Sequence, residues 1–117
     1  MHHNLMVTDE AVNDMGDAII YIRSELCNPD AADRLLEEFR QELINLGNFP
    51  GQGTDSGVNY RNYTIHKKVY RSYLFFYVFD ERSDTITILR ILKNTMNWLG
   101  ILRETKIYHF SNYKNKN

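Results

Sequence analysis

Two apolar stripes with helical spacing, separated by one short break, occupy most of the first half of this 117-residue chain. The stripes consist of Val12, Met15, Ile19, Ile22 and Leu26, and of Ala32, Leu36, Phe39, Leu43 and Leu46. Steps of three and four residues place each set on one face of an α-helix. Because both faces have to be buried and the connection between them is short, the pattern predicts a helical hairpin with a shared seam.

Residues that favour helix ends flank both stripes. Thr8 offers a hydroxyl N-cap to the first helix. Asn28 suits the N-cap of the second helix, and Pro29 suits its first position. Gly47 is placed to end the second helix in a left-handed conformation. Before the first helix, residues 4–7 predict a short strand.

The second half of the chain has the composition of a sheet. The glycine-rich stretch 48–59 predicts a loop. Segments 60–65, 69–79 and 85–92 are rich in aromatic and β-branched residues, which is typical of strands, and the polar run 80–84 has the length of a hairpin connection. Both faces of segment 69–79 are largely apolar, which predicts a central strand covered on both sides. Residues 94–104 predict a third helix.

The predicted order of elements is therefore β-α-α-β-β-β, followed by a third helix. This order indicates an α+β fold in which the helical hairpin packs on one face of a small twisted antiparallel sheet. We expect residues 1–104 to form a single domain. Residues 105–117 are polar and end in Tyr-Lys-Asn-Lys-Asn, so we expect a C-terminal tail there.

Composition bears on compartment and cofactors. Hydrophobic residues make up 43 % of the chain and aromatic residues 13 %, which is enough for a core. No apolar run approaches the roughly 20 residues that span a bilayer, and the first residues lack the pattern of a signal peptide. Cys27 is the only cysteine, so we expect a cytoplasmic protein without an internal disulfide. The histidines show no ligand spacing and no phosphate-binding glycine motif occurs, so we expect no metal and no other cofactor.

The net charge of −1 conceals two halves of opposite sign. Residues 1–60 carry eleven acidic and three basic side chains, whereas residues 61–117 carry eleven basic and four acidic ones. One interpretation is that the basic half forms a face that meets an anionic partner. The other is that the halves form two ordinary solvated faces.

Several local strings occur in an order that resembles the RelE/ParE superfamily of toxins from type II toxin–antitoxin systems. The string Thr8-Asp9-Glu10-Ala11, followed by Asp14-Met15, resembles the start of the first helix, and Asn28-Pro29-Asp30-Ala31-Ala32 resembles the entry to the second. Residues 46–53 are similar to the Leu-x-x-x-Pro-x-x-Gly segment that follows. Residues 73–78 resemble the central strand, and residues 88–92 with Met96-Asn97-Trp98 resemble the last strand and its exit. The resemblance spans residues 5–104.

The resemblance implies a growth-inhibiting toxin that a cognate antitoxin protein neutralises. The ParE-like branch inhibits DNA gyrase without chemistry of its own, whereas the RelE-like branch cuts messenger RNA in the ribosome. RelE-like enzymes carry an arginine in the central strand and commonly His or Tyr after the last strand; Leu74 and Lys93 occupy these positions here. Because leucine carries no charge and lysine is a poor acid or base near neutral pH, we favour gyrase inhibition without enzymatic activity. A ribosome-dependent endoribonuclease and a degenerate toxin kept only as an antitoxin-binding protein remain alternatives.

Basic residues of the second half are the candidates for contact with the target. They are Arg61, Lys67, Lys68, Arg71, Arg90 and Lys93. Arg90 interrupts an apolar strand, so its guanidinium has to pair with a carboxylate or face a functional surface. A nuclease would have to use His66 with Arg71, Arg90 and Lys93, because attack by the RNA 2′-hydroxyl needs a base, an acid and cations. Alternatively, His66 faces solvent at a strand end.

Four aromatic residues are the candidates for contact with the antitoxin. Tyr73, Phe75 and Tyr77 share one face of the central strand, and Trp98 follows the last strand. An antitoxin could lay apolar side chains against such a face. The other interpretation is that these residues belong to the core.

Overall fold

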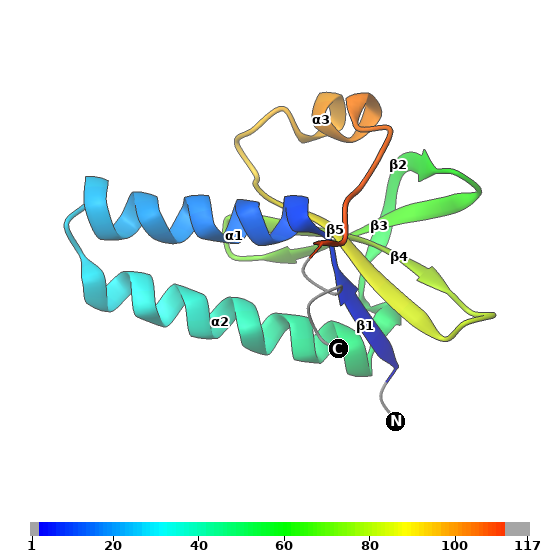
Figure 1. Ribbon diagram of the computed structural model, residues 1–117, viewed down its shortest axis with the longest axis horizontal. Helices are drawn as coiled ribbons and strands as arrows, with labels where there is room; N and C mark the ends of the chain where they lie inside the picture. Colours follow the sequence, from blue (N-terminus) through cyan, green and yellow to red (C-terminus); the bar gives the residue numbers. More distant parts are fainter. Residues whose placement is uncertain (1–2, 112–117) are drawn as a thin grey trace.

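A computed structural model describes residues 3–111 and shows a helical hairpin packed on a five-stranded sheet (Figure 1). The elements are β1 (Asn4–Val7), α1 (Asp9–Ile20), a π-helical turn (Tyr21–Glu25), α2 (Pro29–Asn48), a 3₁₀ turn (Pro50–Gln52), β2 (Thr54–Tyr60), β3 (Tyr63–Tyr70), β4 (Tyr73–Asp80), β5 (Thr85–Lys93) and α3 (Trp98–Glu104). The predicted α+β class and the helical hairpin are confirmed.

The sheet is mixed rather than wholly antiparallel as the sequence predicted. Its strand order is β1-β5-β4-β3-β2, and β2 to β5 form an antiparallel meander. β1 pairs parallel with β5, and Asn4 lies opposite Thr85 at the start of the shared ladder. A parallel pair needs a long crossover connection, and the helical hairpin between β1 and the meander forms part of it.

Four strands follow the hairpin, whereas three were predicted. The predicted segments 60–65 and 69–79 each contain a turn, at residues 61–62 and at residues 71–72. The first residue of each turn has a positive φ, +56° at Arg61 and +54° at Arg71. Left-handed turn positions usually carry Gly, Asn or Asp, so an arginine there gives no turn signal in the sequence.

The stretch predicted as a loop contains β2. Its register with β3 shifts between Asp55 and Asn59, where Gly57 has a φ of +85°. A bulge of this kind accommodates a residue outside the regular ladder, and glycine supplies the backbone conformation that it needs. The turn-like composition of the segment therefore reflects an irregular edge strand rather than a loop.

Both helix N-caps are confirmed. The side chain of Thr8 accepts a hydrogen bond from Ala11 N, and that of Asn28 accepts one from Ala31 N. The predicted C-terminus of α2 is wrong, because the helix runs to Asn48 and Gly47 has no positive φ. Gly47 is instead buried 3.9 Å from the Leu5 side chain, measured from the position of an added Cβ, so its small size serves a close approach to β1.

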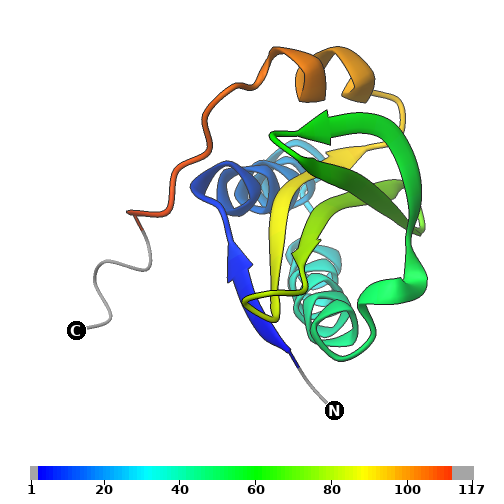
Figure 2. The ribbon, with the colours of Figure 1, turned by 90° about the vertical axis from the view of Figure 1, so that its right-hand side faces the viewer.

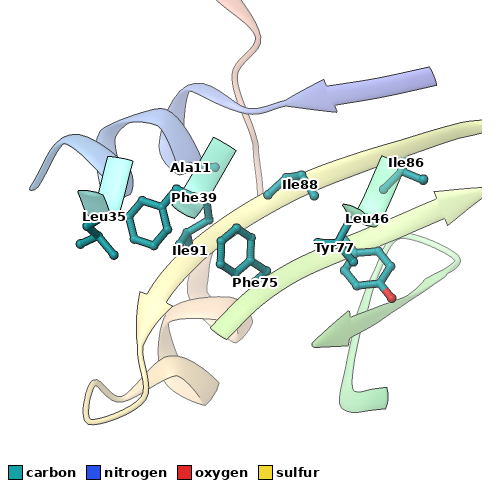
Figure 3. Packing of buried hydrophobic residues seen from close by; sticks show 9 residues of the cluster. All are labelled: Ala11, Leu35, Phe39, Leu46, Phe75, Tyr77, Ile86, Ile88 and Ile91. Carbon is teal, nitrogen blue, oxygen red and sulfur yellow. The ribbon is translucent and has the colours of Figure 1, made fainter. Parts of the chain in front are cut away.

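The core lies on both faces of the sheet, as the apolar faces of the central strand predicted. On one face the helical hairpin covers a cluster that Figure 3 shows. Its buried members are Ala11, Leu35, Phe39, Leu46, Phe75, Tyr77, Ile86, Ile88 and Ile91. On the other face, α3 and the segment that follows it cover a second cluster around Phe76 and Leu92, and Figure 2 shows α3 beside β2. Both faces of β4 are therefore covered.

The segment after α3 folds back onto the domain, although the sequence placed a domain boundary at residue 104. The Tyr108 side chain is 6 % exposed and joins the second core cluster. The backbone of His109 bonds to α1 in both directions, because Asp9 N donates to its carbonyl and its own N–H donates to Glu10 Oε1. Residues 105–111 therefore belong to the domain, and the rest of the predicted tail, residues 112–117, lies outside the described residues.

Candidate functional site

The first turns of α1 cover the edge of β5 beyond the end of β1. β1 stops opposite Ile88, which would leave the next backbone groups of β5 without a neighbouring strand. Thr8 N donates to Ile88 O, Thr8 Oγ1 donates to Leu89 O, and Ile91 N donates to Asp14 Oδ2. Thr8, the N-cap of α1, and the Asp14 side chain thus replace strand partners at this edge, which fixes α1 against β5.

Arg90 makes a bidentate ion pair with Asp14 at the same edge. Its Nε and Nη2 donate to the two carboxylate oxygens, each over 2.8 Å, and the side chains are only 18 % and 10 % exposed. Burial raises the pKa of the Asp14 carboxyl, while the hydrogen bonds to Asp14 raise the pKa of Arg90. We assign the charged pair at neutral pH, because the bidentate geometry needs an acceptor-only carboxylate. Arg90 therefore meets a carboxylate, one of the two outcomes that the sequence left open.

Two further basic residues of the sheet pair with acidic residues of α2. Lys68 Nζ lies 2.7 Å from Glu42 Oε2, whose side chain is 4 % exposed, and Arg71 Nη2 lies 3.2 Å from Glu38 Oε2. Together with the pair on α1, these contacts account for part of the opposite charge of the two halves of the chain. Part of the charge asymmetry is thus neutralised inside the molecule, an outcome that the sequence left open for Arg90 but did not predict for Lys68 or Arg71.

The remaining predicted target-binding residues lie on separate surfaces. Lys67 Nζ lies 4.9 Å from the centre of the Trp98 ring, on the sheet face that α3 covers. Arg61 lies over Tyr60 in the β2–β3 turn, and Lys93 is exposed at the end of β5. The six basic residues therefore do not form one face.

The residues proposed for a nuclease are not gathered in one place either. His66 lies within β3 rather than at a strand end, and its ring is 5.5 Å from that of Tyr77. Arg71 and Lys93 line a common hollow near the tip of the helical hairpin, and neither His66 nor Arg90 is among its lining residues. Leu74, at the position of the RelE-type arginine, is 6 % exposed and belongs to the second core cluster.

Two adjoining hollows of about 260 and 300 Å³ lie between the tip of the helical hairpin and the ends of β4 and β5. They share Tyr21, Tyr73 and Lys93, and we call them together the tip groove. Met96 lines the first hollow and Leu26 the second. Tyr21, Leu26 and Met96 are 51 %, 57 % and 46 % exposed, so the groove presents apolar surface to solvent. Such surface in a concave region is typical of a protein-binding site.

The four residues predicted to bind an antitoxin are separated by the sheet. Tyr73 lines the tip groove, and burial raises the pKa of its phenol. Phe75 and Tyr77 are completely buried beneath the hairpin, and the Tyr77 hydroxyl donates to Pro50 O and accepts from Gly53 N. Trp98 lies on the opposite face, packed on Phe76. Phe75 and Tyr77 are thus core residues, the other interpretation that the sequence allowed.

Sequence reasoning missed Asp14 as the partner of Arg90, and it missed Tyr21 and Met96 in the tip groove. No sequence signal identified Asp14, because it lies outside the predicted apolar stripe and is buried only through the contact of α1 with β5. Tyr21 and Met96 gave no signal either, because an exposed apolar residue is common on protein surfaces.

The described residues contain neither a candidate metal site nor a candidate membrane-spanning helix. Within residues 3–111, no group of three His, Cys, Asp or Glu side chains is placed to hold a metal ion. None of the helices in the same residues combines the length and apolar character that a membrane crossing requires.

Comparison with protein families gives a match for this sequence. The family described as ParE toxin of type II toxin–antitoxin system, parDE, matches residues 5–98. No curated protein matches the chain in sequence.

Two solved toxin–antitoxin structures contain a chain with a similar fold. A chain of the RelBE2 complex from Mycobacterium tuberculosis is 17 % identical with a TM-score of 0.58, and the match covers 80 % of this chain and 92 % of that one. A chain of the chromosomal ParDE system from P. aeruginosa is 19 % identical with a TM-score of 0.61, covering 79 % of this chain and 96 % of that one. Because the family match covers most of the chain, the protein belongs to the ParE toxin family of type II toxin–antitoxin systems.

Proposed function

We propose that this protein inhibits growth by binding DNA gyrase, that it performs no chemistry of its own, and that a cognate antitoxin neutralises it by occupying the tip groove. The place of action is then the cytoplasm, where gyrase and the antitoxin occur. Family membership supports the toxin, and the toxin–antitoxin complexes among the similar structures support an antitoxin partner.

The main observation in favour of a toxin without enzymatic activity is the bidentate ion pair of Arg90 with Asp14. A guanidinium that stabilises a developing phosphate charge needs free donors aimed at the scissile group. Two donor atoms of Arg90 already bind a carboxylate, Leu74 is buried in the core, and His66 is distant in the sheet from Lys93. This arrangement favours a binding toxin over a ribonuclease.

The tip groove supports the antitoxin contact through its combination of apolar and charged side chains. Tyr21, Leu26 and Met96 expose apolar atoms, while Lys93 at the junction of the two hollows is exposed. Within residues 3–111, Lys93 has no carboxylate at ion-pair distance. An amphipathic peptide with an acidic residue beside its apolar anchors would complement this surface.

Two assays on purified protein separate the proposed mechanism from its main alternative. We expect the protein to inhibit the supercoiling of relaxed plasmid by gyrase and to leave messenger RNA intact in a translation mixture. Codon-placed cleavage without gyrase inhibition would establish the ribonuclease instead. If induced expression leaves growth unchanged and both assays are negative, the chain is a degenerate toxin.

A pair of matched variants tests the tip groove. Met96→Glu places a carboxylate in the groove, whereas Ile44→Glu places one at a similarly exposed apolar site on α2, because the two residues are 46 % and 53 % exposed. We expect Met96→Glu to weaken binding of the cognate antitoxin by at least about tenfold, and Ile44→Glu by less than about twofold. Equal effects of the two variants would exclude the groove as the contact.

A further inference from the structure

A hollow of about 270 Å³ lies between the β2–β3 turn and the end of α3, away from the tip groove. It is lined by Val58, Asn59, Tyr60, Arg61, Leu102, Arg103, Thr105 and Lys106. Three of these residues are basic and none is acidic. Figures 1 and 2 both show α3 beside β2, so segments about 40 residues apart in the sequence meet here.

The three basic residues differ from those that face the helical hairpin. Arg90, Lys68 and Arg71 each have a carboxylate partner on α1 or α2. Among residues 3–111, Arg61, Arg103 and Lys106 have none at ion-pair distance, and all three are exposed. Glu104 is also exposed nearby but does not line the hollow. Among the described residues, three cations that face the hairpin are therefore neutralised, whereas Lys93 in the tip groove and all three cations around this hollow have no ion-pair partner.

Family membership does not account for the hollow. The family match ends at residue 98, and Leu102, Arg103, Thr105 and Lys106 lie beyond it. These residues are nevertheless held firmly, because Leu102 and Tyr108 are buried in the second core cluster and His109 bonds to Glu10. The hollow is therefore an anchored feature of this chain, with Arg61 from the matched region as its third charge.

Polar atoms beside the charges suit an anion with several oxygens. Asn59 supplies amide donors at the same hollow, whereas the Thr105 hydroxyl already donates to Ile101 O. Arginine binds phosphate through two donors at once, and lysine binds it as a point charge. Lys67, at the opposite end of α3 from Arg103, extends the positive surface by about the 10 Å length of a seven-residue helix.

We propose that this surface binds the phosphate backbone of double-stranded DNA independently of base sequence. A single strand would need free aromatic faces for base stacking, and none is offered here. The Tyr60 ring meets Tyr108 edge-on and is covered by Arg61, while the Trp98 ring packs on Phe76 and is covered by Lys67. The inference goes beyond the proposed function, because it requires neither gyrase nor an antitoxin.

The test measures binding of the full-length protein to a fluorescent duplex of about 20 base pairs by anisotropy, at several salt concentrations. We expect the logarithm of affinity to fall with the logarithm of salt with a slope of about −2 to −3, because each neutralised phosphate contributes roughly 0.9. Arg103→Glu/Lys106→Glu should weaken binding at least about tenfold. Arg34→Glu/Arg40→Glu changes net charge equally at exposed sites on α2, which packs on the other face of the sheet, and should weaken it less than about twofold.

Arg61→Asn provides a second variant. It should fold like the parent protein, because asparagine tolerates the positive φ of this turn. It should weaken duplex binding severalfold and reduce the salt slope by about one. Three outcomes overturn the inference: no duplex binding at low salt, equal effects of the two double variants, or displacement of the duplex by polyglutamate or single-stranded RNA at lower concentration than by unlabelled duplex. Supercoiling inhibition without duplex binding would leave the proposed function intact and remove only this inference.

Discussion

Asp14 and Arg90, which lie 76 residues apart in the chain, are joined by two hydrogen bonds of 2.8 Å at the edge of β5 that α1 covers. The same carboxylate accepts the backbone N–H of Ile91. Asp14 therefore satisfies both a side-chain charge and a backbone donor of the strand. A residue that in the sequence looks like an ordinary helix acid determines how α1 sits on the sheet.

Loss of the Asp14 charge should destabilise the fold. Asp14→Asn leaves the Arg90 guanidinium, whose side chain is largely buried, without its anion, so we expect the free energy of unfolding to fall by about 3 kcal/mol. Urea denaturation followed by the fluorescence of Trp98 measures it. Asp17→Asn, at an exposed site on the same helix, should change stability by less than about 0.5 kcal/mol. Similar values for the two variants would show that the pair contributes little.

Two neighbouring glycines should respond differently to alanine. At Gly53 an added Cβ would lie 2.5 Å from the Tyr77 hydroxyl and 3.0 Å from Lys67 O, whereas at Gly51 nothing lies within 4 Å. Because Tyr77 is completely buried and cannot move away, we expect Gly53→Ala to cost about 2 kcal/mol. Gly51→Ala should lower the free energy of unfolding by only a small fraction of that amount. Thermal denaturation of both variants measures the difference. Equal stabilities would mean that the Tyr77 ring has room to shift.

Tyr108 should make stability fall at alkaline pH. Burial raises the pKa of its phenol to about 12, although the positive charge of Arg90 and a hydrogen bond with the Thr105 side chain act in the opposite direction. The phenol ionises near pH 10 in the unfolded chain but only near 12 in the folded one, so stability is retained below pH 10 and lost as pH rises through this window. Tyr108→Phe should remove the steepest part of the loss, which urea denaturation at about pH 8 to 11 measures. An unchanged alkaline loss in Tyr108→Phe would show that another group causes it.

Acid should loosen the segment after α3. Burial raises the pKa of the Glu10 carboxyl, but hydrogen bonds from the backbone and ring of His109 outweigh it and hold that pKa below its usual 4.5. The resulting stabilisation is present above pH 4.5 and is lost as pH falls through the folded-state pKa. We expect hydrogen exchange at the His109 amide to increase over that pH range more steeply than exchange at the amides of the core strands. Glu10→Gln should show fast exchange at every pH, whereas Glu104→Gln should match the parent protein.

Local signals in the sequence predicted the elements that depend on neighbouring residues. The caps at Thr8 and Asn28 form as expected, because a capping side chain bonds only two or three residues away. The turns at Arg61 and Arg71 were missed because the sheet, rather than the residue type, imposes their left-handed conformation. Gly47 was misassigned because it serves a contact with β1 instead of a helix end.

The candidate site was harder to predict than the fold. That Arg90 needed a carboxylate or a surface followed from one strand, but the identity of Asp14 depends on a contact between distant segments. The tip groove could not be predicted either, because Tyr21 and Lys93 become neighbours only after α1 and β5 have packed together. Sites built from separate elements require the tertiary arrangement itself.

The parallel pairing of β1 with β5 constrains the order in which the newly made chain can fold. β1 leaves the ribosome first, yet its only paired strand among the described residues ends at Lys93. The nascent chain can form a helical hairpin early, but the sheet cannot close until most of the polypeptide has emerged. A prematurely terminated product lacking β5 would leave β1 without a partner, so interrupted translation should yield no folded toxin.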